Sequence, residues 1–263
     1  MIVEQVWTAN AWRNFNYLVA CEETGEALAI DPLDHQKCLG LARERGWTIR
    51  QVLNTHEHGD HTGGNAAMVA ATGAQVLAHA NAAPAIREMT RGLKAGDVIT
   101  VGRTVELECL DTPGHTMAHV CLLSRTPEPA LFSGDTLFNA GAGNCHNGGH
   151  PRQLYQTFVG QLAKLPDTTR IYPGHDYLAR NLAFTLDREP TNDKARDWIG
   201  QAERMDPAHA FVTTLGLEKE INVFFRLQNA EVVRQLRAKL PDLPAKPTSE
   251  DVFLALRELR NKW

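Results

Sequence analysis

A run of metal-binding side chains directly after an apolar strand pattern is the feature that most constrains this chain. Residues 55–64 read THEHGDHTGG, which places three imidazoles and a carboxylate within six residues. The preceding residues 49–53, IRQVL, have the character of a strand, and loops at strand ends are where α/β folds present functional side chains. A turn at the first glycine can direct the first two histidines to one metal ion and the other two ligands to a second. We therefore expect a metal site here rather than a solvated polar loop, with the candidate ligands His56, His58, Asp60 and His61.

Three further candidate ligands repeat this arrangement later in the chain. They are His115, Asp135 and His175, which follow the strand patterns at 105–110, 130–133 and 171–172. A lone histidine is more often a structural residue. Here, however, a strand, a small turn residue and a metal-capable side chain recur in the same order. Because Zn²⁺ prefers a mixture of nitrogen and oxygen ligands, the repetition predicts that these side chains meet at one metal centre.

The predicted secondary structure of the chain changes near residue 175. Before that point, short β-like runs alternate with turn signals and a few helices, which indicates an α/β fold. After it, proline-punctuated helical patterns dominate, so we expect an α/β domain over 1–175 and a helical C-terminal region over 176–263. The expected strands lie at 17–20, 27–30, 49–53, 75–78, 98–101, 105–110, 119–123 and 130–133, and the expected helices at 35–45, 153–164, 177–188, 192–204, 229–239 and 249–260.

Composition excludes several classes of protein. The 263 residues are 43% hydrophobic and carry a net charge of −4, which argues against non-specific binding to nucleic acid. No run reaches the ~18 apolar residues that a membrane-spanning helix needs, and the first ten residues lack the character of an export signal. The five cysteines form no CxxC pair, so we expect no disulfide framework and a reducing cytoplasm.

The pattern HxHxDH at 56–61, with the later histidine, GD and GH motifs, resembles the metallo-β-lactamase superfamily. The resemblance implies an αββα sandwich with two divalent metal ions at one edge of its two sheets. Zinc is the expected metal, although iron and manganese also suit mixed His/Asp sites. By motif position, the first metal ligands are His56, His58 and His115, the second are Asp60, His61 and His175, and Asp135 bridges the two ions.

Two divalent ions held about 3.5 Å apart lower the pKa of a bridging water, and the resulting hydroxide can attack a carbonyl carbon. We expect Asp60 to be both a ligand and the acceptor that orients this hydroxide. A thiolate leaving group needs little help from a general acid, since the pKa of a thiol is near ~8.5. A thioester is therefore a natural substrate, while lactones, phosphodiesters and β-lactams suit the same metal site.

Residues 173–184, PGHDYLARNLAF, closely resemble the corresponding segment of glyoxalase II, the hydroxyacylglutathione hydrolase family. Residues 213–226 and 251–263 resemble the loop and the basic closing helix of that family. By position, Tyr177 matches a tyrosine that contacts glutathione, and Arg257 and Arg260 match basic residues that bind its carboxylates. The resemblance implies hydrolysis of S-2-hydroxyacylglutathione such as S-lactoylglutathione, a step of methylglyoxal detoxification.

One segment departs from the family pattern. After the GD motif the family usually has GCG followed by a basic residue and aromatic residues, whereas residues 141–151 here read GAGNCHNGGHP. The basic and aromatic glutathione contacts become Asn144 and His146, and we expect both to contribute to the substrate pocket. Asn144 can still donate a hydrogen bond to a glycyl carboxylate, more weakly than a cation does. We expect no catalytic role for Cys145.

Three alternatives have distinct signatures. An iron persulfide dioxygenase of the same fold would use a two-histidine, one-carboxylate centre at His56, His115 and Asp135. A secreted β-lactamase conflicts with the missing export signal and with the helical tail. A non-catalytic metal-binding module has no need for seven ligands. These patterns leave the acyl group, the native metal pair and the oligomeric state open.

Overall fold

The computed structural model describes residues 1–263 and contains two six-stranded sheets that face each other. The first sheet has the order β1 (Ile2–Trp7), β2 (Phe15–Ala20), β3 (Glu26–Ile30), β4 (Thr48–Leu53), β5 (Gln75–His79) and β6 (Met89–Leu93). The second has the order β14 (Thr213–Thr214), β13 (Arg170–Pro173), β10 (Ala130–Gly134), β9 (Val120–Ser124), β8 (Val105–Asp111) and β7 (Val98–Val101). A separate ribbon pairs β11 (Leu137–Phe138) with β12 (Gly141–Ala142).

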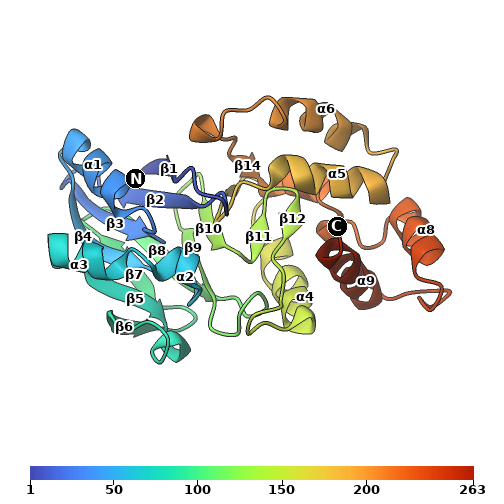
Figure 1. Ribbon diagram of the computed structural model, residues 1–263, viewed down its shortest axis with the longest axis horizontal. Coiled ribbons are helices and arrows are strands. Elements are labelled where there is room, and N and C mark those ends of the chain that lie inside the picture. The colour runs from blue at the N-terminus through green and yellow to red at the C-terminus, as the bar shows by residue number, and fades with distance from the viewer.

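The two sheets enclose a core of 19 buried residues between them. Alternate side chains of a strand point to opposite faces of its sheet, so Val105, Leu107 and Cys109 of β8 all enter this core. On the outer face of the first sheet lie α1 (His35–Arg45) and α3 (Asn65–Thr72), as Figure 1 shows. The helix α1 begins at Asp34, whose side chain accepts a hydrogen bond from Lys37 N, and ends at Gly46 in the left-handed conformation.

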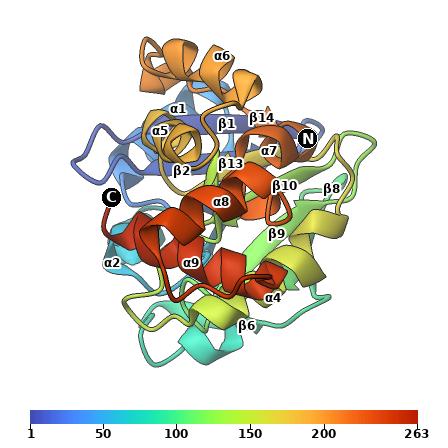
Figure 2. The same ribbon diagram turned by 90° about the vertical axis from the view of Figure 1, so that its right-hand side faces the viewer.

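Six further helices lie beyond the second sheet (Figure 2): five share a hydrophobic cluster with its outer face, and the one at Asp193–Ala202 packs on its neighbouring helices instead. They are α4 (Pro151–Gly160), α5 (Leu178–Arg188), α6 (Asp193–Ala202), α7 (Leu215–Ile221), α8 (Ala230–Lys239) and α9 (Ser249–Asn261). One hydrophobic cluster joins Leu131 and Ile171 of the sheet to Phe253 and Leu256 of α9. The C-terminal helices therefore share a core with the sheet, and the expected αββα sandwich with a helical C-terminal region is confirmed.

Several elements differ from the sequence expectation. Strand β6 was not predicted, because MTRGL is polar and contains glycine, and it forms only by pairing parallel to β5. The helix expected over 153–164 ends at Gly160 and is followed by a short 3-10 turn, Leu162–Lys164. The helices expected at 35–45, 177–188 and 249–260 are present with ends within one residue. None of the helices has both the length and the apolar character needed to cross a bilayer.

Candidate metal centre

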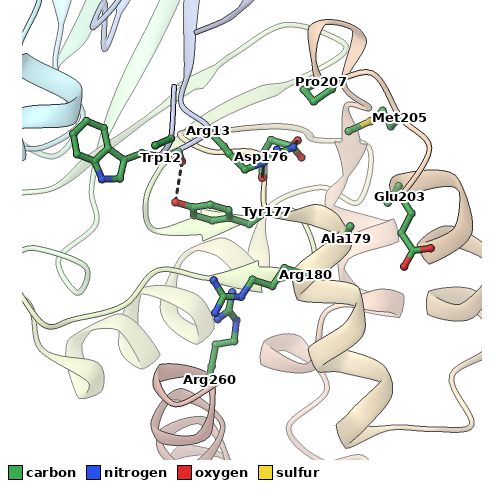
Figure 3. A pocket seen from close by; sticks show the side chains of 12 residues that line it. Trp12, Arg13, Asp176, Tyr177, Ala179, Arg180, Glu203, Met205, Pro207 and Arg260 are labelled. Carbon is green, nitrogen blue, oxygen red and sulfur yellow. Dashed lines mark hydrogen bonds and ion pairs between the residues drawn. The ribbon is translucent and has the colours of Figure 1, made fainter. Parts of the chain in front are cut away.

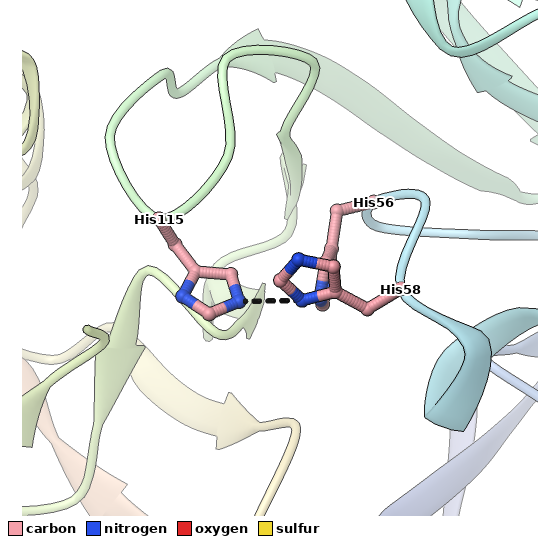
Figure 4. Close-up of side chains that lie close together, drawn as sticks. All are labelled: His56, His58 and His115. Carbon is pink, nitrogen blue, oxygen red and sulfur yellow. Dashed lines mark hydrogen bonds between the residues drawn. The ribbon is translucent and has the colours of Figure 1, made fainter. Parts of the chain in front are cut away.

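The first cluster of candidate ligands contains His56, His58 and His115, which Figure 4 shows with their rings facing one another. The first two lie in the loop that leaves β4, and the third follows β8. His58 Nδ1 lies 3.1 Å from His56 Nε2 and 3.1 Å from His115 Nε2. Three imidazole nitrogens therefore converge on one point at the edge of the two sheets.

The second cluster contains Asp60, His61 and His175. The first two lie in the single turn of α2 (Gly59–Thr62), and the third follows β13. His61 Nε2 lies 3.3 Å from His175 Nε2, and Asp60 Oδ2 lies 3.6 Å and 3.4 Å from these two nitrogens. The HxHxDH pattern thus divides between two neighbouring clusters.

Asp135, at the end of β10, lies between the two clusters. Its Oδ2 is 3.5 Å from His115 Nε2, and its Oδ1 is 3.4 Å from His61 Nε2. Burial would raise the pKa of Asp135, but His175 and His61 outweigh it and hold the pKa of this carboxyl well below its usual range. Gly174 permits this approach, because a Cβ there would lie 2.3 Å from Asp135 Oδ1.

Each of the five histidine rings is held from behind by an acceptor of the protein. The acceptors are Thr55 Oγ1 for His56, the Asn147 carbonyl for His58, Asp31 Oδ2 for His61, the Asn144 carbonyl for His115 and the Trp12 carbonyl for His175. Carbonyl and carboxylate oxygens only accept hydrogen bonds, and the Thr55 hydroxyl donates its own proton to Asp31 Oδ2, so the outer nitrogen of each ring carries the proton. The inner nitrogen of each ring consequently presents a lone pair to the centre.

This donor set fits two divalent cations. Inward lone pairs 3.1 to 3.3 Å apart repel each other unless a cation lies among them. Asp135 Oδ1 is buried without a hydrogen-bond partner, which is costly for an ionised carboxylate. Burial lowers the pKa of His56 well below its usual value, which favours the neutral imidazole that metals bind. Nitrogen and carboxylate ligands at two adjacent points match a binuclear centre.

Asp31 is a functional residue that the sequence analysis did not identify. Its carboxylate accepts hydrogen bonds from Thr55 N at 2.8 Å and from Thr55 Oγ1 at 2.7 Å, and it also holds His61. It follows β3 and has a φ of 48°, a left-handed conformation that is uncommon outside glycine. The rule that found the other carboxylates, a side chain directly after a strand, could also have found this one.

Two more residues that support the candidate ligands were not predicted from the sequence. Asn14 Nδ2 donates to Asp60 Oδ2 at 3.1 Å and so fixes the orientation of that carboxylate. His119 is fully buried, stacks on His56 and accepts a hydrogen bond from Asp135 N at 3.2 Å. Both residues act on the candidate ligands from behind rather than joining them.

The loop at 141–151, which differs from the family pattern, contributes main-chain atoms to the centre. The carbonyl oxygens of Asn144 and Asn147 hold His115 and His58. The side chains of Asn144 and His146 are exposed, and Asn144 Oδ1 accepts a hydrogen bond from His146 N, which closes the turn locally. The expected contacts of Asn144 and His146 with a substrate stay predictions, while the support from the loop backbone was not foreseen.

The three remaining predicted residues lie in contrasting environments. Tyr177 stacks on His175 with ring centroids 5.0 Å apart and donates to the Trp12 carbonyl at 3.0 Å. Arg260 is half-buried at the edge of a hollow beside Tyr177. Arg257 is only 4% exposed and donates to the carbonyl oxygens of residues 142 and 143 at 2.7 and 2.9 Å. This burial was not predicted.

Comparisons with known proteins agree with this geometry. The sequence model of the metallo-beta-lactamase superfamily matches residues 15–175, and that of the hydroxyacylglutathione hydrolase C-terminus matches residues 176–263. The chain is 62% and 64% identical to the hydroxyacylglutathione hydrolases of Nitrosococcus oceani and Polaromonas sp., with complete coverage of every chain. The cytoplasmic hydroxyacylglutathione hydrolase of Arabidopsis thaliana is 34% identical over 95% of this chain and 93% of its own length.

Two solved structures are also similar. ETHE1 from Myxococcus xanthus superimposes with a TM-score of 0.69 at 26% identity, and the match covers 98% of this chain and 99% of that one. TTHA1623, solved in a di-iron-bound form, superimposes with a TM-score of 0.60 at 26% identity, covering 84% of this chain and 98% of that one.

Proposed function

This chain belongs to the hydroxyacylglutathione hydrolase family of the metallo-β-lactamase superfamily, and from that premise we propose that it hydrolyses the thioester of a glutathione carrier. The substrate class is S-2-hydroxyacylglutathione, such as S-lactoylglutathione, and the products are the hydroxy acid and glutathione. The observation that carries this proposal is a centre of seven donors in a chain that matches such hydrolases over its full length.

The proposed ligands of the first metal are His56, His58 and His115, those of the second are Asp60, His61 and His175, and Asp135 serves both. When bound, two divalent cations lower the pKa of a water molecule and polarise the carbonyl oxygen of the substrate. We assign zinc to both positions, because borderline Zn²⁺ suits a shell of imidazole and carboxylate ligands. Elemental analysis of the purified protein tests this assignment against iron and manganese.

The protein's own residues orient the reactants. Asp60 is held by Asn14 and is 23% exposed, so its carboxylate can accept a hydrogen bond from the attacking water and aim it at the thioester carbon. Tyr177 packs its ring on His175 and covers one side of the centre. The departing thiolate needs no proton donor of its own, because the pKa of its thiol lies near ~8.5. The absence of a dedicated acid from the cluster is consistent with a thioester substrate.

We divide the chain at about residue 175 into a metallo-β-lactamase domain and a C-terminal region that binds the carrier. The meeting of the two family models between residues 175 and 176 supports this division. We also propose that the enzyme works in the cytoplasm. Its five cysteines are all unpaired, and the Arabidopsis relative is named for that compartment.

Steady-state hydrolysis of S-lactoylglutathione by metal-loaded protein tests the proposal. We expect a kcat/KM above about 10⁵ M⁻¹s⁻¹, within the usual enzyme range. His58→Ala is expected to lose this turnover together with bound metal, while His209→Ala, an exposed histidine outside the centre, keeps both. A protein that holds two metals but turns over no thioester would contradict the proposal.

The same preparations distinguish the hydrolase from a persulfide dioxygenase. A single iron ion needs only three of the seven donors, whereas the structure presents two complete clusters. We therefore expect no oxygen consumption when glutathione persulfide is supplied. Rapid oxygen uptake by iron-loaded protein would favour the dioxygenase.

A further inference from the structure

The loop at 8–14, which joins β1 to β2, is bound directly to the metal centre. The carbonyl oxygen of Trp12 accepts hydrogen bonds from His175 Nδ1 at 2.7 Å and from the Tyr177 hydroxyl at 3.0 Å. One of these donors is a candidate metal ligand, and the other is the ring that stacks on it. The position of Trp12 is therefore fixed relative to the second cluster of ligands.

Two residues of this loop have an uncommon backbone conformation. Ala9 has a φ of 59° and Arg13 a φ of 62°, in the left-handed region that residues other than glycine rarely adopt. Arg13 is kept there because its guanidinium pairs with the Asp176 carboxylate and its Nε donates to the Asp176 carbonyl at 2.9 Å. Backbone strain of this kind is concentrated at functional sites, so the shape of the loop favours a role in the site for what it presents.

The largest side chain of the loop, the indole of Trp12, is left in solvent. It is 60% exposed, more than any other large apolar side chain of the protein. An exposed indole contributes little burial to folding, whereas at a binding site it supplies a rigid apolar surface. Because the main chain of the same residue holds His175 and Tyr177, the indole stands at the rim of the metal centre.

The indole is directed away from the C-terminal region. An arginine-lined hollow of about 720 Å³, into which Arg180 of α5 and Arg260 of α9 project, lies on the other side of Tyr177 from the centre. Figure 3 shows the indole of Trp12 pointing away from these two arginines. Since the C-terminal region is the part that we assign to the carrier, the indole is available to the other half of the thioester, which is the acyl group.

Space for an acyl substituent is present beside Asp60. Gly59 has no side chain, and a Cβ there would meet no atom within 4 Å. Asn14, two residues after Trp12, donates to the carboxylate and to the main-chain oxygen of Asp60, at 3.1 Å in both cases, so the loop borders this space. Because Asp60 orients the attacking water in the proposed function, a group attached to the reacting carbonyl carbon can extend into this space.

We propose that Trp12 determines specificity for the acyl group, and that its indole packs on the substituent of the hydroxyl-bearing carbon. This inference rests on the proposed function and adds to it the residue that distinguishes one 2-hydroxyacyl group from another. An indole favours substituents with a flat or bulky apolar surface. The phenyl group of a mandeloyl thioester therefore gains more from Trp12 than the methyl group of a lactoyl thioester does.

The test measures kcat/KM for S-glycoloyl-, S-lactoyl- and S-mandeloylglutathione, in which this substituent is hydrogen, methyl and phenyl. Metal-loaded wild type is compared with Trp12→Ala, with Trp12→Phe and with the control Val98→Ala, which shortens an exposed apolar side chain of β7. For Trp12→Ala we expect the ratio of kcat/KM for the mandeloyl to the glycoloyl substrate to fall about 3- to 10-fold, since an aromatic contact is lost. Trp12→Phe keeps most of the ratio, and Val98→Ala keeps all of it.

The ratio is independent of the fraction of active protein, so a folding defect does not imitate the effect. Trp12→Ala is expected to keep the metal content of the wild type, because alanine retains the carbonyl oxygen that holds His175. An unchanged ratio in Trp12→Ala would overturn the inference and leave the proposed function intact, whether activity on the three substrates is kept or lost equally. An equal loss together with a loss of metal would assign Trp12 to the support of His175 instead. A wild type that hydrolyses none of the three thioesters would remove both the proposed function and this inference.

Discussion

The histidine cluster and the arginine-lined hollow lie on opposite sides of Tyr177 and are supported in contrasting ways. Every ring of the cluster has a second hydrogen bond to the protein, and the three supporting main-chain carbonyls come from two loops, Asn144 and Asn147 from the loop at 141–151 and Trp12 from the loop after β1. In the hollow, Arg180 is exposed and Arg260 half-buried, and each has one hydrogen-bonding partner. The metal centre is preorganised as a unit, whereas the hollow depends on individual side chains.

This difference has a physical basis. Metal ligands must be held within a few tenths of an ångström, and fixing each ring from behind meets that requirement. A carrier carboxylate needs only a favourable charge and a fork of donors, which a partly exposed arginine supplies. We therefore expect changes in the cluster to lower kcat and metal content together, and changes in the hollow to raise KM alone.

Removing the shared carboxylate gives the largest expected effect. Asp135→Asn keeps the shape of the side chain but loses the charge that faces both clusters, so we expect kcat to fall by about 10³-fold or more. Bound metal is expected to fall below two ions per chain in elemental analysis. Asp242→Asn, in an exposed loop, is the control and keeps both values. Full activity in Asp135→Asn would contradict the binuclear assignment.

Asp31→Asn is expected to have the next largest effect, because it leaves all seven candidate ligands in place and weakens only the hydrogen bond to the outer nitrogen of His61. Asparagine tolerates the left-handed backbone at this position but accepts the hydrogen bond from His61 less strongly. We expect the affinity for the second metal to fall about 10- to 100-fold. Activity that returns with excess metal supports this role, and a loss that metal does not reverse would indicate a folding defect instead.

Arg257→Met tests whether that arginine belongs to the rigid part of the site. The substitution leaves the carbonyl oxygens of Ala142 and Gly143 without their donor inside the protein. We expect the free energy of unfolding to fall by about 2–4 kcal/mol. Chemical denaturation of the variant and of the exposed Arg237→Met control measures the difference. An unchanged stability with a raised KM would return Arg257 to direct binding of the substrate.

The smallest expected effect is on the pH dependence of the free energy of unfolding, through a buried carboxyl group of the C-terminal region. Glu218 of α7 is fully buried and accepts a hydrogen bond from Ala140 N at 2.8 Å. Burial raises its pKa from 4.5 to about 7, so the folded protein binds more protons than the unfolded chain between these values. Stability therefore falls as pH rises through this window.

Glu218→Gln is expected to remove that share of the pH dependence, about 1–3 kcal/mol between pH 4.5 and 7. Glu220→Gln, exposed on the same helix, is the matched control. Denaturation curves measured at several pH values give the comparison. Equal pH profiles for wild type and Glu218→Gln would show that this carboxyl does not titrate in the window.

Much of this protein could be predicted from its sequence. The seven candidate ligands were recognisable because metals select a few side-chain types, and because each type stood directly after a strand pattern. The order of strands and helices followed from their periodicity, except where β6 depends on pairing with β5. These features depend on the identity of side chains and on their spacing over a few residues, and a sequence shows both directly.

The tertiary structure alone decided which atoms support that chemistry. A main-chain carbonyl is the same in every residue, so no sequence pattern marked the oxygens of Trp12, Asn144 and Asn147 as acceptors for the histidine rings. The rotation of α9 against the sheet placed Arg257 inside and Arg260 in the hollow, although both lie on one basic helix. That difference depends on tertiary packing, because residues three apart share one side of a helix, and only the neighbouring segments decide that Arg257 meets the carbonyl oxygens of Ala142 and Gly143 while Arg260 meets Asn181.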